Sequence, residues 1–264
     1  MNISIDLIKK LRDMTLAPLW SCKDALIEAE GDIDQAQEIL KKKWAIKADK
    51  NADRETNAWV VKFVINNWAL VGIKLLCETD FVSKNDSFLG LVDQILDMIS
   101  KESQDINPDA VPETLLDGIT TLLKDNAVKI GENMKPAYII KRTGTVAVYN
   151  HMGNNLSSAV FYSGDAEAFA KDCTLQVAAM NPLYISVDNV DKSRIDALTQ
   201  EFTEEMSTVD KPADIKNKII EWKVQKALQD DILLEQVSIK DPTKKIKELM
   251  PQWSALIDMI RVSI

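Results

Sequence analysis

One stretch decides the fold of this chain, residues 70–86, which read Leu70-Val71-Gly72-Ile73-Lys74-Leu75-Leu76-Cys77-Glu78-Thr79-Asp80-Phe81-Val82-Ser83-Lys84-Asn85-Asp86. Its apolar first half is typical of a short β-strand. After it, apolar residues recur at spacings of three and four, which indicates a helix over about residues 86–99. Either Asn85 or Asp86 suits the N-cap of that helix. The stretch therefore predicts a strand, a short polar connection and a helix.

Phe81 is the unexpected residue of this connection. It follows Asp80, at a point where the chain should be exposed. A bulky ring in an exposed loop either folds into the protein's own core or is offered to a partner. On the pattern alone, a place in the core is the more common fate of a phenylalanine.

The flanking sequence completes an α+β unit over residues 59–136. Residues 60–65 form an alternating strand, and Asn66-Asn67 has the chemistry of a turn, so that the strand at 70–76 returns as a hairpin. A second helix is expected at about residues 115–130.

A second strand-and-helix unit is expected over residues 137–186, with a helix at 166–180 that Pro182 stops. Two apolar stripes over residues 187–236 predict an αα-hairpin. The remaining residues, 237–264, form a terminal module, in which a helical stretch is expected to hold Ile246, Leu249, Leu256 and Ile260.

The first 47 residues predict a bundle of three short helices, with breaks at Pro18 and Gly31. Residues 48–58 lack an apolar stripe and indicate a polar linker or a frayed helix end. A bundle this small usually presents an apolar patch to another protein. The candidates for that patch are Arg12, Leu19 and Trp20, although the two apolar side chains could instead close the small core.

Composition and charge argue against a nucleic-acid-binding, membrane-spanning or secreted protein. The formal net charge of −9 argues against nucleic acid as the main partner. No apolar run approaches the roughly 20 residues that span a bilayer, and the N-terminus lacks the pattern of a secretory signal. The three cysteines, Cys22, Cys77 and Cys173, are far apart and show no paired spacing, which indicates free thiols rather than disulfides. Free thiols are typical of a reducing compartment, so we expect a cytoplasmic location.

The motifs of common enzyme and cofactor sites are missing from the sequence. It contains neither a phosphate-binding Gly-x-x-x-x-Gly-Lys-Ser/Thr loop nor a Gly-x-Gly-x-x-Gly. The sequence has a single histidine, His151, and no serine lies in a nucleophile-elbow motif that could pair with it. No set of histidine, cysteine or acidic residues has the spacing of metal ligands. The sequence therefore predicts no catalytic residues, no cofactor and no metal site.

Five ordered stretches resemble the bacterial elongation factor Ts family, the nucleotide-exchange factors for elongation factor Tu. The signature is Cys77-Glu78-Thr79-Asp80-Phe81-Val82-Ser83-Lys84-Asn85-Asp86. The others are the N-terminal Ile8-Lys9-Lys10-Leu11-Arg12 with Cys22-Lys23-Asp24-Ala25-Leu26 and Glu30-Gly31-Asp32-Ile33, then Lys129-Ile130-Gly131-Glu132-Asn133, Ala178-Ala179-Met180-Asn181-Pro182 and Leu233-Leu234-Glu235-Gln236. Together they cover nearly the whole chain.

The resemblance implies an α+β fold in which an N-terminal three-helix bundle like a ubiquitin-associated domain precedes two tandem strand-and-helix subdomains with an inserted αα-hairpin arm. It also implies that the protein promotes GDP release from elongation factor Tu by displacing the elements that bind magnesium and nucleotide. Phe81 would be the wedge, Asp80 the polar contact beside it, and Thr79 and Val82 the residues that hold the loop. His151 resembles a further contact from the second unit, with a surface turn histidine as the alternative.

A second hypothesis is a plain interaction or chaperone-like module that uses the bundle and the arm without exchange activity. An assay of GDP release separates the two hypotheses, because binding without acceleration supports the second. A homodimer or a 2:2 assembly with elongation factor Tu is left open by the sequence.

Three tryptophans, Trp44, Trp59 and Trp222, fall where the resembling sequences usually have glycine. Trp44 follows three lysines, at an expected helix end that would favour a C′ glycine. Either these are real substitutions with locally packed rings, or the host reads the corresponding triplet as glycine.

Overall fold

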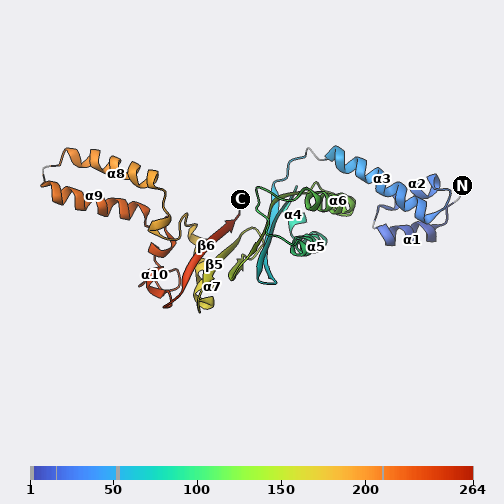
Figure 1. The fold of residues 1–264 in the computed structure, drawn as a ribbon. Helices are drawn as coiled ribbons and strands as arrows, with labels where there is room; N and C mark the ends of the chain where they lie inside the picture. Colours follow the sequence, from blue (N-terminus) through green and yellow to red (C-terminus); the bar gives the residue numbers. More distant parts are fainter. Residues whose placement is uncertain (1–2, 16, 52–53, 210, 264) are drawn as a thin grey trace. The chain divides into compact units, whose positions relative to one another are not determined.

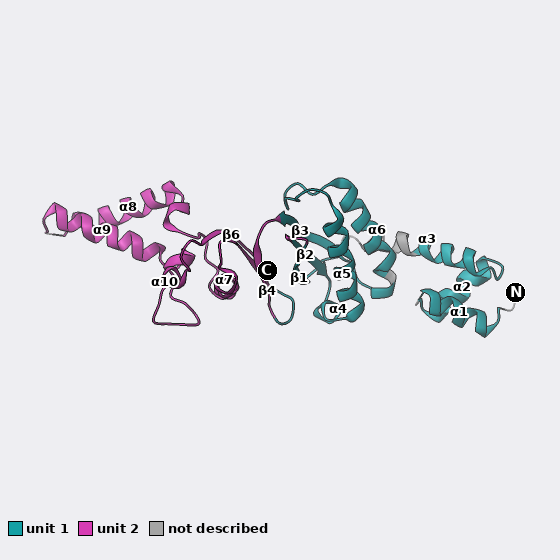
Figure 2. Cartoon of the chain, turned by 60° about the horizontal axis from the view of Figure 1, so that its bottom comes forward, with its two compact units in different colours: residues 1–66, 70–142, 152–155 teal, residues 67–69, 143–151, 156–264 magenta. Residues whose placement is uncertain are grey.

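The computed structural model describes residues 3–15, 17–51, 54–209 and 211–263. The chain divides into two compact units, which Figure 2 colours separately. The first contains residues 1–66, 70–142 and 152–155, and the second contains residues 67–69, 143–151 and 156–264. The finer division that the sequence predicts stays a prediction.

The N-terminal residues form the expected three helices, α1 (Ile5–Thr15), α2 (Leu19–Glu28) and α3 (Ile33–Asn51), in a ubiquitin-associated-like bundle (Figure 1). Its core contains the fully buried Leu11 and Leu26. Gly31 has a φ of +92° and donates its N–H to the Leu26 carbonyl at 2.8 Å, which ends α2. The Asp32 carboxylate then accepts from the Asp34 and Gln35 amides in the first turn of α3.

The third helix is longer than the sequence analysis expects. It continues to Asn51, so the predicted helix end at Trp44 is wrong, and the first part of the 48–58 segment is helical. Lysine and alanine are good helix formers, and no glycine or proline interrupts this run. The side chain of Trp44 lies outside the part of the chain that the structure describes.

The first unit contains a three-stranded sheet in the order β1 (Ala58–Asn66), β2 (Ala69–Cys77) and β3 (Lys135–Thr143). A two-residue turn, Asn67-Trp68, joins β1 to β2, which confirms the predicted hairpin. The third strand belongs to this sheet, although most of its residues fall within the second unit expected over residues 137–186. Gly72 lets the ring of Phe63 approach the backbone, since a Cβ there would lie 2.5 Å from the ring.

Three helices follow β2 on one face of this sheet: α4 (Asp80–Ser83), α5 (Asp86–Lys101) and, further on, α6 (Glu113–Ile130) (Figure 1). The apolar stripe predicted for α5 is buried throughout and packs with Val71, Ile73 and Leu75 of β2. Asn85 caps α5, because its side-chain oxygen accepts from the Ser87 amide at 2.8 Å. This core fixes the end of β2 and the start of α5, and thereby the connection between them.

The second unit contains a sheet in the order β4 (Val146–Asn150), β5 (Ser157–Ser163) and β6 (Ala255–Val262), with α7 (Glu167–Met180) packed on it. The predicted helical stretch of the tail is only partly correct. Ile246 and Leu249 lie in the short helix α10 (Ile246–Leu249), but Leu256 and Ile260 lie in β6 and pair with β5.

The helices α8 (Lys192–Ser207) and α9 (Ala213–Leu228) form the predicted αα-hairpin (Figure 1). Two short 3₁₀ turns flank this hairpin, at Val187–Asn189 and Leu233–Glu235. Its seam is formed by buried residues from both helices, among them Leu198, Met206, Ile220 and Val224. No helix in the described ranges is long and apolar enough to cross a membrane.

Candidate functional site

The connection between β2 and α5 is more ordered than a loop. After Cys77 ends the strand, Thr79 adopts an extended conformation and caps the single helical turn of α4. Its hydroxyl oxygen accepts from the Val82 amide at 3.4 Å, and the Ser83 hydroxyl donates to the Asp80 carbonyl at 2.9 Å. The sequence predicts a polar connection here but not this helical turn.

Phe81 lies in the first turn of α4 with 82% of its surface exposed. The next residue, Val82, packs against the core of the first unit. The chain is therefore anchored beside the ring while the ring itself projects into solvent. The reading favoured by pattern alone, a phenylalanine in the protein's own core, is wrong.

Asp80 is exposed beside Phe81 and accepts from the Lys84 ammonium at 2.8 Å. The hydrogen bond and the charge of Lys84 lower the pKa of the Asp80 carboxyl. Beside the apolar ring, the site thus presents an exposed carboxylate that is paired with the Lys84 ammonium.

Glu132 is the residue of this site that the sequence analysis missed. One of its carboxylate oxygens accepts from the backbone amides of Glu78 at 3.0 Å and of Thr79 at 2.9 Å. The other accepts from the Thr79 hydroxyl at 2.5 Å. Glu132 and Thr79 both lie in stretches that carry the family resemblance, but no local pattern predicts that they meet across so many residues.

Cys77 adjoins this hydrogen-bonded group and is fully buried. Burial, reinforced by the negative charge of Glu132, raises the pKa of the Cys77 thiol to about 12. Its thiol donates to the Thr79 carbonyl at 3.3 Å. A raised pKa favours the neutral thiol, which is the less nucleophilic form.

His151 lies in the second unit, at the end of β4, and is exposed. Its amide donates to the Leu156 carbonyl at 2.9 Å, and a hydrogen bond of 2.8 Å joins its Nδ1 to the Tyr149 hydroxyl. The histidine thus has a fixed ring on an open surface, next to Met152, which is also exposed.

Arg12, Leu19 and Trp20 line one shallow groove of the N-terminal bundle, with a volume of about 280 Å³. Its other lining residues are Ile5, Ile8, Lys9 and Lys23. The Trp20 ring is 69% exposed and Leu19 is also exposed, so they do not close the core of the bundle. The groove combines an apolar floor with three cationic side chains and no acid.

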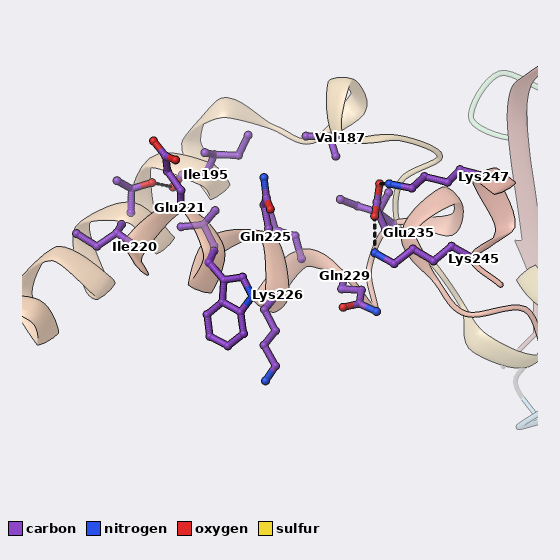
Figure 3. A pocket seen from close by; sticks show the side chains of 15 residues that line it. Val187, Ile195, Ile220, Glu221, Gln225, Lys226, Gln229, Glu235, Lys245 and Lys247 are labelled. Carbon is purple, nitrogen blue, oxygen red and sulfur yellow. Dashed lines mark hydrogen bonds and ion pairs between the residues drawn. The ribbon is translucent and has the colours of Figure 1, made fainter. Parts of the chain in front are cut away.

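A larger cavity, of about 640 Å³, lies at the base of the α8–α9 hairpin (Figure 3). Its lining includes Ile195, Ile220 and Val224. At one end, Glu235 accepts from the ammonium groups of Lys245 and Lys247, each at 2.8 Å (Figure 3). These two hydrogen bonds lower the pKa of the Glu235 carboxyl. The carboxylate is neutralised within the protein, which suits a structural ion pair.

The part of the chain that the structure describes holds no group of three or more histidine, cysteine, aspartate or glutamate side chains that could bind a metal ion.

Comparison with known proteins identifies the family of the chain. The family model described as "Elongation factor TS" matches residues 78–264. The elongation factor Ts of Hydrogenobaculum sp. (strain Y04AAS1) is 38% identical over 256 residues, which cover 94% of this chain and 93% of the relative. The elongation factor Ts of Chlorobium phaeobacteroides (strain BS1) is 35% identical over 272 residues, which cover 98% and 94%. That of Aquifex aeolicus (strain VF5) is 30% identical over 279 residues, which cover 99% and 96%.

The fold and the comparisons define a translation elongation factor with an α+β core, a ubiquitin-associated-like bundle and an αα-hairpin. The chain belongs to the elongation factor Ts family.

Proposed function

We propose that this protein binds elongation factor Tu and promotes GDP release by displacing the elements that hold magnesium and nucleotide, so that GTP can be reloaded. The observation that carries the proposal is the exposed ring of Phe81 on an anchored helical turn. The protein works by binding and is not an enzyme, and it acts in the cytoplasm without a cofactor.

The mechanism rests on a difference in affinity. A GTPase holds its nucleotide and magnesium with a phosphate cradle and positioned ligands. A partner that binds more tightly to the conformer with displaced ligands shifts the equilibrium towards it, and the shift equals the difference in binding free energy. Burial of a phenylalanine ring contributes roughly 1.5–3 kcal/mol, which is comparable with a typical coupling of about 1–3 kcal/mol.

The residues around the ring have distinct roles in this proposal. Phe81 is the wedge, and Asp80 offers its ionised carboxylate to a polar group of elongation factor Tu. Thr79 and Val82 hold the turn, through the cap and through packing on the core. His151, and the groove of Arg12, Leu19 and Trp20, supply further contacts with the same partner.

The test is GDP release from the cognate elongation factor Tu at a saturating concentration of this protein. We expect Phe81→Ala to slow the stimulated release by about tenfold or more. The displaced state of elongation factor Tu loses the free energy gained by burying the ring, which is more than about 1 kcal/mol. Phe81→Leu, which keeps an apolar side chain, should retain part of the stimulation. The acceleration should also depend on magnesium.

Circular dichroism should show that Phe81→Ala is folded, because an exposed ring makes little contribution to stability. Stimulated release that is unchanged by Phe81→Ala would remove the wedge role. Binding of the wild-type protein without any acceleration would instead identify an interaction or chaperone-like module.

A further inference from the structure

We infer that Glu132 is a positioning residue for nucleotide exchange, which holds the start of α4 so that Phe81 is presented before the partner binds. This inference rests on the proposed function of Phe81. Glu132 does not need to touch elongation factor Tu, because it acts through Thr79.

The contacts of Glu132 converge on the residues that lead into α4. Its carboxylate accepts three hydrogen bonds, from the amides of Glu78 and Thr79 and from the Thr79 hydroxyl. Hydrogen bonds that an ionised carboxylate accepts are shorter and stronger than those between neutral groups. The carboxylate thereby fixes both the backbone and the side chain of Thr79.

The interaction is reciprocal, since Glu78 returns a contact to the segment that carries Glu132. A Glu78 carboxylate oxygen accepts from the Asn133 amide at 2.7 Å, and the same oxygen lies 3.6 Å from an Arg54 guanidinium nitrogen. The Asn133 side-chain amide donates to the Arg54 carbonyl at 2.9 Å. The segments at 78–79 and 132–133 are therefore joined in both directions, with Arg54 as a countercharge.

The position of Thr79 passes to Phe81 through the helix cap. The Thr79 hydroxyl donates a hydrogen bond to Glu132, and its oxygen accepts from the Val82 amide. The turn that displays Phe81 is thus capped by a hydroxyl whose orientation Glu132 sets. A ring that is already in place costs less conformational entropy on binding than one on a mobile loop.

The first measurement is amide hydrogen exchange on the free protein, which is independent of elongation factor Tu. We expect Glu132→Ala to speed exchange at the Glu78 and Thr79 amides by about tenfold or more, because these donors lose their acceptor. Glu132→Gln, which keeps one carbonyl oxygen, should have a smaller effect. Glu113→Gln, at the other end of α6 and exposed, is the matched control and should change nothing at these amides.

The second measurement is stimulated GDP release as a function of protein concentration. Glu132→Ala should lower the maximal rate about tenfold, because the hydrogen bonds to the carboxylate are lost. The maximal rate of Glu132→Gln should lie between those of the wild type and Glu132→Ala. In a double-mutant cycle, Glu132→Ala should have little further effect when Phe81 is already alanine. A merely structural role would lower stability and would reduce activity equally in both backgrounds.

The outcomes separate this inference from the proposed function. If Phe81→Ala slows release but the Glu132 variants do not, the positioning role is wrong and the wedge stands. If the wild-type protein gives no acceleration, the proposed function is wrong, and amide exchange still shows whether Glu132 orders residues 78–79. If Glu132→Ala does not fold, Glu132→Gln decides by the same measurements, and unchanged exchange at both amides overturns the inference.

Discussion

At the scale of single residues, two tryptophans adopt a backbone conformation that suits glycine. Trp68 and Trp253 each have a φ of +61°, and their rings are 77% and 95% exposed. Residues with a Cβ pay roughly 1–2 kcal/mol in this left-handed region. Trp68 occupies the second position of a two-residue hairpin turn after Asn67, where Asn-Gly is the favoured pair.

The tryptophans singled out from the sequence behave differently. Trp59 lies in β1, where its indole N–H donates to the Asn155 carbonyl at 3.0 Å. Trp222 lies within α9, with the Lys226 ammonium 4.8 Å from its ring centroid. Neither Trp59 nor Trp222 has a positive φ. The backbone conformation that favours glycine is found instead at Trp68 and Trp253, which the sequence did not single out.

We expect Trp68→Gly and Trp253→Gly each to raise the free energy of unfolding by about 1 kcal/mol, because the strain is relieved and exposed rings lose little packing. Trp222→Gly is the matched control and should lower it by about 1 kcal/mol, because glycine is unfavourable inside a helix. Urea unfolding measures all three. Destabilisation by glycine at 68 and 253 would refute the strain argument.

The masses of the proteolytic peptides of the protein from its native host then decide between the two explanations of these tryptophans, because each peptide assigns the residue to its position. Glycine at positions 68 and 253 in the host protein would show that the triplet is read as glycine there. Tryptophan at both positions would show real substitutions that tolerate the strained backbone.

At the scale of elements, the sequence predicts what short-range patterns determine. The stripe of α5, the hairpin of β1 and β2, and the paired helices α8 and α9 are all set by neighbouring residues, and all were predicted. The strand β6 was not, because Leu256 and Ile260 have a spacing that fits a helix as well. Pairing with β5, far upstream, decides its conformation, and no local pattern records that pairing.

The same distinction applies to the site. Hydrophobicity alone favoured the core for Phe81, but its ring is exposed. Its contact with a partner, which the resemblance implies, stays a prediction. Glu132 was missed because its partners, Glu78 and Thr79, are distant in the sequence. Contacts between residues that are distant in the sequence could not be predicted from local sequence patterns.

The ion pairs of Glu235 give a prediction for the segment after α9. Its two lysine partners lower the pKa of the carboxyl below the ordinary value of 4.5. The pairs therefore stabilise the fold at neutral pH, and this contribution is lost as the pH falls through the lowered pKa. We expect Glu235→Gln to reduce the free energy of unfolding at pH 7 by about 1 kcal/mol or less, as partly exposed pairs do.

Urea unfolding over a series of pH values measures this effect. The difference between wild type and Glu235→Gln should persist to below the ordinary glutamate range and then shrink. Glu248→Gln, an exposed glutamate of α10, is the control and should show no such pH dependence. A difference that stays constant down to strongly acidic pH would exclude the ion pairs as its source.

At the scale of the whole molecule, the candidate contacts are spread over both compact units. Phe81 and the groove around Trp20 belong to the first unit, and His151 belongs to the second. The chain carries a net charge of −9, yet the groove is lined by Lys9, Arg12 and Lys23 without an acidic residue. This local reversal of charge favours an acidic, partly apolar surface of the partner.

We expect substitutions in the groove around Trp20 and at Phe81 to change different kinetic parameters of GDP release. A contact made equally in the ground state and the displaced state changes affinity alone, whereas the wedge proposed for Phe81 would change the maximal rate. We expect Trp20→Ala to raise the concentration for half-maximal GDP release about tenfold, as the loss of an exposed aromatic anchor does, with the maximal rate unchanged. Ile27→Ala, an exposed apolar residue of α2 outside the groove, should alter neither. A lower maximal rate for Trp20→Ala would mean that the bundle takes part in nucleotide displacement itself.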